Sequence, residues 1–111
     1  MKVTLKRDPK KSYVVYGVYW AIFNEKIQRH HFVIEHSDKL AGFSVLCEEE
    51  VDISDSSLSH YVMSKDDYDK DMFIHKAALS PQQLFLELVN HDNFESVTTL
   101  FNNMNELNLE I

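Results

Sequence analysis

The fold class is decided by residues 13–35, which read as two strands joined by a tight turn: YVVYGVYWAIFNEKIQRHHFVIE. Residues 13–23 are almost all β-branched or aromatic, which predicts one strand with both faces covered. Gly17 within this run indicates a bulge or a close approach of another part of the chain. Residues 24–26, Asn-Glu-Lys, are typical of a hairpin turn, and residues 27–35 of the returning strand.

Shorter strands are predicted on both sides of this hairpin, over residues 3–6, 43–47, 51–54, 60–64 and 72–76. A basic turn through Asp8 and Pro9 follows the first of them, and residues 37–42 are expected to form a loop. In the strand 43–47, alternation places Phe43, Val45 and Cys47 on one face. The last two strands flank the acidic turn KDDYDKD, residues 65–71, as the arms of a second hairpin.

Helix signals begin after residue 77. Ser80 is predicted as an N-cap, with Pro81 at the first helical position and Gln83 completing a capping box. A buried stripe is expected from Leu84, Phe85 and Leu88. The sequence therefore predicts a helix that starts at residue 81.

The same apolar period continues towards the C-terminus. Asp92 and Glu95 repeat the capping pattern, and a 3.6-residue period runs through Phe94, Val97, Leu100, Phe101 and Met104. Two helices, or one kinked helix, are expected over residues 81–104. Alternation of Leu107, Leu109 and Ile111 predicts a final strand. Strands followed by helices predict an α+β fold, an antiparallel sheet with one or two C-terminal helices packed on one face.

Length and composition predict one domain, residues 1–111. The single cysteine, Cys47, excludes an internal disulfide and is typical of a reducing compartment. The N-terminus lacks the apolar segment of a secretory signal, and the apolar run 13–23 is too short to span a bilayer. These observations predict a soluble cytoplasmic domain.

The net charge of −7 is unevenly distributed. Residues 1–12 carry five basic groups and one acid, whereas residues 48–71 carry nine carboxylates and two lysines. Such an acidic block repels nucleic acid and anionic lipid and attracts cations or basic proteins. The basic cluster at residues 6–11 lies near aromatic strands, which is the one feature that favours nucleic acid. The overall acidity favours a solvated edge instead, so no nucleic-acid or membrane partner is expected.

The acidic turn is first tested as a calcium site. Asp67, Asp69 and Asp71 match the first three ligand positions of an EF-hand loop. The required glycine and bidentate glutamate are replaced by Met72 and Ala78, and strands rather than helices flank the turn. A solvated turn is the favoured interpretation, with a weak cation site as the alternative.

The histidines do not predict a zinc site. His30 and His31 are adjacent in a strand and so point to opposite faces. His60 and His75 lie on the two arms of the second hairpin and are expected to face each other, but they supply only two ligands. No metal or other cofactor is predicted.

Nucleophilic catalysis has no signature in this chain. Three glutamates follow Cys47, and their charge raises the pKa of a thiol and opposes thiolate formation. The serines lack a glycine-framed elbow, and the two glycines, Gly17 and Gly42, cannot build a phosphate loop. We therefore expect no catalytic residue and no enzyme activity.

Protein recognition is the remaining interpretation of the acidic segment. Carboxylates on short loops speed encounter with a basic surface, and tyrosines are rigid anchors at interfaces. A purely solubilising surface is the alternative. The candidate partner-binding residues, expected together at one end of the sheet, are Glu48, Glu49, Glu50, Asp52, Asp55, Tyr61, Asp66, Asp67, Tyr68, Asp69 and Asp71.

With EEEVDISD at 48–55 and KDDYDKD at 65–71, this small acidic α+β chain resembles the immunity proteins of bacterial toxin–immunity systems, including contact-dependent growth inhibition. The resemblance is one of architecture and charge along the whole chain. It implies a cytoplasmic protein that binds one cognate basic toxin, commonly a nuclease, in a 1:1 complex. It also implies inhibition by covering the active site or the substrate surface, with carboxylates pairing to basic residues.

Two other functions stay open at this point. One is an adaptor or regulatory domain that binds a protein without inhibiting it. The other is a small enzyme or ligand-binding domain with a pocket between sheet and helices. A cavity that reaches His60, His75 or Cys47 would favour the pocket.

Overall fold

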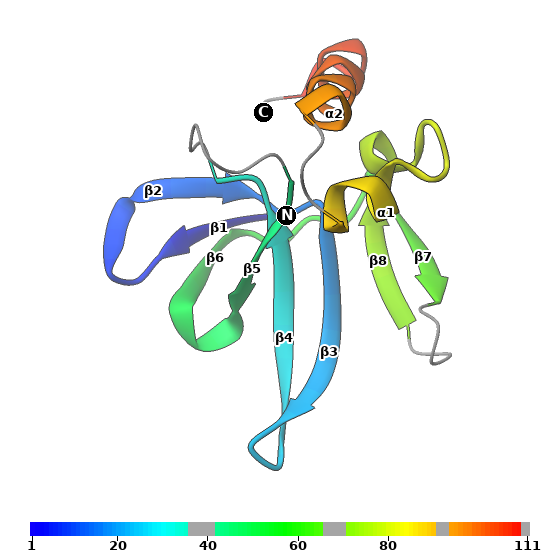
Figure 1. Cartoon of the computed structure of the whole chain (residues 1–111). Coiled ribbons are helices and arrows are strands. Elements are labelled where there is room, and N and C mark those ends of the chain that lie inside the picture. Colours follow the sequence, from blue (N-terminus) through cyan, green and yellow to red (C-terminus); the bar gives the residue numbers. More distant parts are fainter. Residues whose placement is uncertain (36–41, 66–70, 91–93, 110–111) are drawn as a thin grey trace.

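The computed structural model describes residues 1–35, 42–65, 71–90 and 94–109 (Figure 1). Within these ranges two antiparallel sheets precede two α-helices, so the predicted α+β class is confirmed, with two sheets in place of one. None of the described helices is long and apolar enough to cross a membrane.

The smaller sheet has the strand order β2-β1-β6. Its strands are β1 (Lys2–Leu5), β2 (Asp8–Val14) and β6 (Val51–Asp55), close to the expected strands at 3–6 and 51–54. The expected turn through Asp8 and Pro9 is wrong, because Lys6 and Arg7 form the turn and Pro9 lies in β2. Proline is tolerated there because β2 is an edge strand.

The larger sheet has the order β5-β4-β3-β8-β7, with every pair antiparallel. The strands are β3 (Gly17–Phe23), β4 (Lys26–Val33), β5 (Ser44–Cys47), β7 (Tyr61–Lys65) and β8 (Asp71–His75). The β3–β4 turn is confirmed at Asn24 and Glu25, whose φ angles are 51° and 66°. Positive φ at both positions is typical of a tight two-residue hairpin turn. Figure 1 shows this hairpin extending away from the helices.

The single strand expected over residues 13–23 is wrong. Val15 and Tyr16 cross from the smaller sheet to the larger one, and both side chains are buried. The Val15 amide donates to the Met1 carbonyl, whereas the Tyr16 amide donates to the Phe32 carbonyl. The residue pattern hides this break because the side chains on both sides of it are buried and apolar.

Two cores result from this arrangement. The residues buried between the two sheets are Val3, Leu5, Val15, Val18, Val33, Leu46 and Val51. The residues buried between the larger sheet and the helices are Tyr16, Ile34, Phe43, Ile74, Ala77, Ala78, Leu84, Phe85, Leu88, Leu100 and Met104. In β5, Leu46 is buried and Val45 is exposed, so Val45 does not share a buried face with Phe43. Phe43 precedes β5, and its amide donates to the Leu88 carbonyl.

The predicted N-cap at Ser80 is also wrong. A 3₁₀ helix, η2 (Lys76–Leu79), precedes Ser80, and α1 (Leu84–Val89) begins four residues after it. Tertiary contacts hold this segment, because the Asn103 side-chain amide donates to the carbonyls of Ala77 and Ser80 at 2.8 and 2.6 Å. The predicted burial of the α1 stripe is confirmed for Leu84, Phe85 and Leu88.

The second helix, α2 (Phe94–Glu106), buries Leu100 and Met104 as predicted. The prediction that Phe94 belongs to the buried stripe is wrong, since this first residue of α2 is 64% exposed. Asn108 has a φ angle of 55°, and the Leu109 amide donates to the Met104 carbonyl. This turn terminates α2. Leu107 and Asn108 thus form a turn instead of the expected strand. Asp92 and Ile111 lie outside the described residues.

Candidate functional site

The two acidic segments lie at different places on the larger sheet. The 3₁₀ helix η1 (Glu48–Glu50) follows β5 at one edge, and Asp71 begins β8 next to the other edge. In Figure 1 the β3–β4 hairpin lies between them. They lie towards opposite edges of the sheet but towards the same end, because Asp71 precedes Met72, the partner of Tyr19, and Glu48 binds the amide of Arg29, the partner of Trp20. Asp66, Asp67, Tyr68 and Asp69 lie outside the described residues.

The glutamates of η1 bind the edge of β4 beyond the end of β5. The Glu48 Oε1 accepts from the Arg29 amide at 2.8 Å, and the Glu49 Oε1 accepts from the Gln28 Nε2 at 3.1 Å. An edge strand with unpaired amides is a template for unwanted pairing. Glu48 therefore satisfies a backbone amide of β4 beyond the end of β5, whereas Glu49 binds a side chain and still reaches solvent.

Two further carboxylates of the acidic segment, those of Glu50 and Asp55, also have local contacts. The Glu50 Oε2 accepts from the Cys47 amide at 3.0 Å, and the Asp55 Oδ1 accepts from the Ser57 amide at 2.9 Å. Asp52 is exposed on β6, and Asp55 lies opposite Lys2 in the smaller sheet. Asp52 is consequently the described carboxylate of this segment for which no local hydrogen bond is identified.

Cys47 is a free, half-buried thiol. Burial raises its pKa, and the charges of Glu50 and Glu49 raise it further. The predicted direction is confirmed, with burial as the larger cause. A raised pKa disfavours the thiolate that nucleophilic catalysis requires.

Exposed apolar side chains gather on one face of the β3–β4 hairpin, a surface that the sequence analysis missed. Trp20 and Ile22 share this face, and Ile27 lies directly opposite Ile22. The Trp20 ring meets the Phe73 ring edge-on with centroids 6.1 Å apart, and Met63 lies opposite Phe73. Ile22 and Ile27 are each 71% exposed, because the hairpin extends beyond the smaller sheet that covers the same face. We call these five residues the hairpin patch.

A basic side chain, Arg29, lies beside the hairpin patch. Arg29 is opposite Trp20 in register, and its Nε donates to the His31 Nε2 at 2.7 Å. The Arg29 amide is the group bound by Glu48. The acidic helix η1 therefore runs along the β4 side of the patch.

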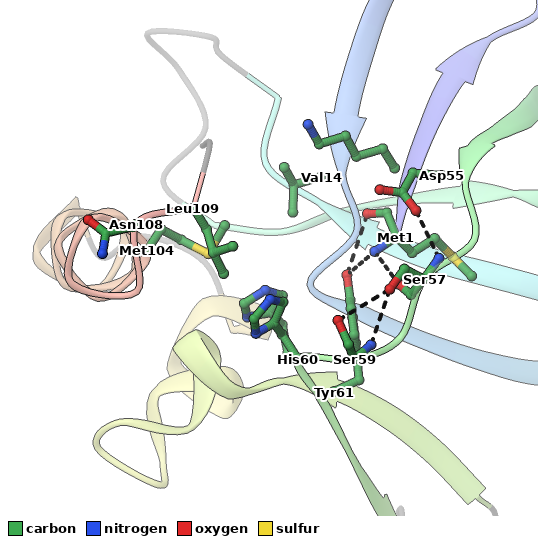
Figure 2. A pocket seen from close by; sticks show the side chains of 12 residues that line it. Met1, Val14, Asp55, Ser57, Ser59, His60, Tyr61, Met104, Asn108 and Leu109 are labelled. Carbon is green, nitrogen blue, oxygen red and sulfur yellow. Dashed lines mark hydrogen bonds between the residues drawn. The ribbon is translucent and has the colours of Figure 1, made fainter.

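A cavity of about 320 Å³ lies between the smaller sheet, the start of β7 and the end of α2 (Figure 2). Polar side chains on one side of it include Ser59, His60 and His75. Val14, Met104 and Leu109 line it with apolar groups. The cavity reaches both histidines, which is the feature expected of the pocket alternative.

Tyr61 lines this cavity instead of forming an exposed anchor. Its hydroxyl accepts from the Met1 amino group at 2.8 Å and donates to the Val15 carbonyl. Burial raises the pKa of the Tyr61 hydroxyl and lowers the pKa of the Met1 amino group. Tyr61 therefore holds the first residue against the crossover between the sheets.

His60 and His75 face each other, as the sequence predicts. Their ring centroids are 6.0 Å apart at an interplanar angle of 24°. The His75 Nδ1 accepts from the Ala77 amide at 3.0 Å, which places the proton of the neutral ring on Nε2. Burial, followed by the charges of His60 and the Met1 amino group, lowers the pKa of His75 to about 4. His75 is therefore neutral at pH 7.

The described residues include no group of three or more His, Cys, Asp or Glu side chains placed to hold a metal ion. Asp67 and Asp69 of the tested calcium loop lie outside this part of the chain. His30 and His31 have different surroundings, as predicted. His30 stacks on Tyr19, whereas the His31 Nδ1 bonds to the Leu46 carbonyl at 2.8 Å.

A second hollow, of about 560 Å³, lies between β7, β8 and α1. Its walls are mainly apolar and include Phe32, Met72 and Phe85. Gln82 and Gln83 stand at its border with α1. It shares no lining residue with the histidine cavity.

Comparison of the chain with protein-family models, with curated proteins and with solved structures finds no match.

Proposed function

We propose that this protein is a non-catalytic inhibitor of the immunity type, which binds a basic partner protein, such as a nuclease toxin, in the cytoplasm. The observation that carries the proposal is the hairpin patch bordered by the carboxylates of η1. It moves the centre of the expected interface from the KDDYDKD turn to the β3–β4 hairpin.

The composition of the patch supports protein recognition. Trp20 and Arg29 are residue types enriched among the side chains that dominate binding energies, and Phe73 and Met63 extend their apolar surface. Ile22 and Ile27 remain largely exposed, although burying such side chains is favourable by about 1.5–3 kcal/mol each. A partner that covers this face would gain that energy.

The charge of the border supports a basic partner. Glu49 and Glu50 are exposed beside the hairpin, and Asp52 follows them on β6. Carboxylates at the rim of an interface speed association with a basic protein and favour it over acidic competitors. An apolar centre with an acidic rim suits an inhibitor of a phosphate-binding enzyme, because carboxylates can pair with the basic residues that otherwise bind the substrate phosphates.

The experiment is a capture from the native cell, followed by an activity assay of the captured protein. The chain with the substitutions Trp20→Asp and Ile27→Asp is compared with a control that carries Leu86→Asp. Leu86 is 64% exposed on α1 and lies outside the hairpin patch. We expect wild type and control to retain one basic protein and to inhibit its enzymatic activity, and the patch variant to do neither.

Two results would contradict the proposal. One is equal retention by the patch variant and the control, with both folds verified by circular dichroism. The other is a captured protein whose activity is unchanged by the chain, which would favour an adaptor.

A further inference from the structure

The histidine cavity is lined by His75, a buried residue whose Nε2 has no protein acceptor among the described residues. His75 is 3% exposed, and its Nδ1 is occupied by the Ala77 amide. The proton therefore lies on Nε2, which has no hydrogen-bond partner among the described residues. Among the described residues, His30 Nδ1 is the fully enclosed side-chain atom without a partner, so His75 Nε2 is accessible from the cavity. An acceptor bound in the cavity can therefore pair with it.

Other donors lie around the same space. The Ser59 hydroxyl accepts from the Ser57 hydroxyl at 3.2 Å, which leaves its own proton available. The His60 ring and the Asn108 amide also line the cavity, and Figure 2 shows them on opposite sides of it. Lys2 and Asp55 are both at the cavity and lie opposite each other in register, so their charges offset. Ser59, His60 and Asn108 can each donate a hydrogen bond into the cavity.

The other wall of the cavity is apolar. Val14 comes from the end of β2, and Met104 and Leu109 come from the end of α2. A volume of about 320 Å³ corresponds to roughly ten water molecules in the liquid. A ligand of about ten non-hydrogen atoms, with oxygen acceptors at one end and a hydrocarbon body, matches this volume and lining.

We infer that this cavity binds a small organic carboxylate, whose oxygens accept hydrogen bonds from His75 Nε2 and Ser59 while its hydrocarbon part contacts Met104 and Leu109. A carboxylate is favoured over a single carbonyl because its two oxygens accept from several donors at once. This site is independent of the hairpin patch, and the inference does not rest on the proposed inhibitor function.

The test uses hexanoate as the probe and hexylammonium as the matched control, which has the same hydrocarbon body and the opposite charge. Binding to the full chain is followed by NMR, from the backbone amides and the histidine ring signals. We expect hexanoate to cause saturable shifts at His60 and His75, and hexylammonium to cause none there. Absence of saturable shifts with hexanoate, or equal shifts with both probes, would overturn the inference.

A pair of His75 variants locates the donor. His75→Asn retains an acceptor for the Ala77 amide and removes the group at Nε2, so it should bind hexanoate at least about tenfold more weakly. His75→Gln retains an N–H donor near Nε2 and should bind more tightly than His75→Asn. Wild-type affinity in His75→Asn would overturn the assignment. If that variant does not fold, the comparison of the two probes on the wild-type chain decides the question.

Discussion

The substitution Gly17→Ala tests how closely α1 packs on the larger sheet. A Cβ atom at residue 17 would lie 2.7 Å from Phe85 Cε2, 2.9 Å from Phe85 Cζ and 3.2 Å from Phe32 Cδ2. Carbon atoms in contact prefer about 3.5–4.0 Å, so the Phe85 ring would have to move by nearly 1 Å. Its centroid is only 5.2 Å from that of Phe32 and 5.1 Å from that of Phe43, which leaves little room.

Overpacking of this kind destabilises a core by about 1–3 kcal/mol. Alanine is favoured over glycine in a strand by about 0.5–1 kcal/mol, which offsets part of that loss. We therefore expect Gly17→Ala to lower the free energy of unfolding by about 1–2 kcal/mol. The assay is urea unfolding at pH 7, followed by circular dichroism and by the fluorescence of Trp20, the single tryptophan.

The matched control is the same substitution in a chain that carries Phe85→Leu. With the ring removed, Gly17→Ala should cost less than about 0.5 kcal/mol, so the two substitutions should be non-additive. An equal cost of Gly17→Ala in both backgrounds, or no cost in the wild-type background, would refute the packing argument.

Three further predictions concern the pH dependence of stability, the contact of Asn103 with the segment before α1, and the acidic rim of the hairpin patch. The unfolded chain titrates His75 near pH 6.5 and the folded chain near pH 4, so the unfolded state binds more protons between these values. The free energy of unfolding should therefore fall as the pH is lowered from 6.5 to 4, by at most about 1.4 kcal/mol per pH unit from this residue. Urea titrations should show a shallower fall for His75→Asn, and an identical pH profile would contradict the assigned burial. Asn103→Ala should lower the free energy of unfolding by about 1–2 kcal/mol because two carbonyls lose their donor. Ser80→Ala should change it by less than about 0.5 kcal/mol. A larger loss of stability for Ser80→Ala than for Asn103→Ala would support Ser80 as the helix cap. Glu49→Gln keeps an oxygen that can accept from Gln28. It should slow association with the captured basic protein at low salt only, as measured by stopped flow. If the variant and the wild type associate at the same rate at low salt, Glu49 is not part of the acidic rim.

Much of the site could not be predicted, although some of its parts could. The facing of His60 and His75 is predictable because both lie near the ends of two strands that pair as a hairpin, in which Tyr61 is opposite His75. The apolar wall of the cavity comes from β2 and α2, which are distant in sequence. The inward position of Tyr61 depends on acceptors and donors at Met1 and Val15, which no local pattern relates to it.

The sequence by itself determined the hairpin turn at Asn24 and Glu25 with a strand on each side, the later strands, the apolar stripes of two helices and hence the α+β class. These features depend on local backbone preference and on residue periodicity, which act within a few positions of the chain. Only the tertiary structure decided that residues 13–23 divide at Val15 and Tyr16, that Asn103 overrides the capping signal at Ser80, and that the hairpin patch stays uncovered. It also decided that η1 and Asp71 lie towards opposite edges of the larger sheet. The physical reason is that strand order and helix docking depend on contacts between residues far apart in the chain, and the same local pattern is compatible with several such orders.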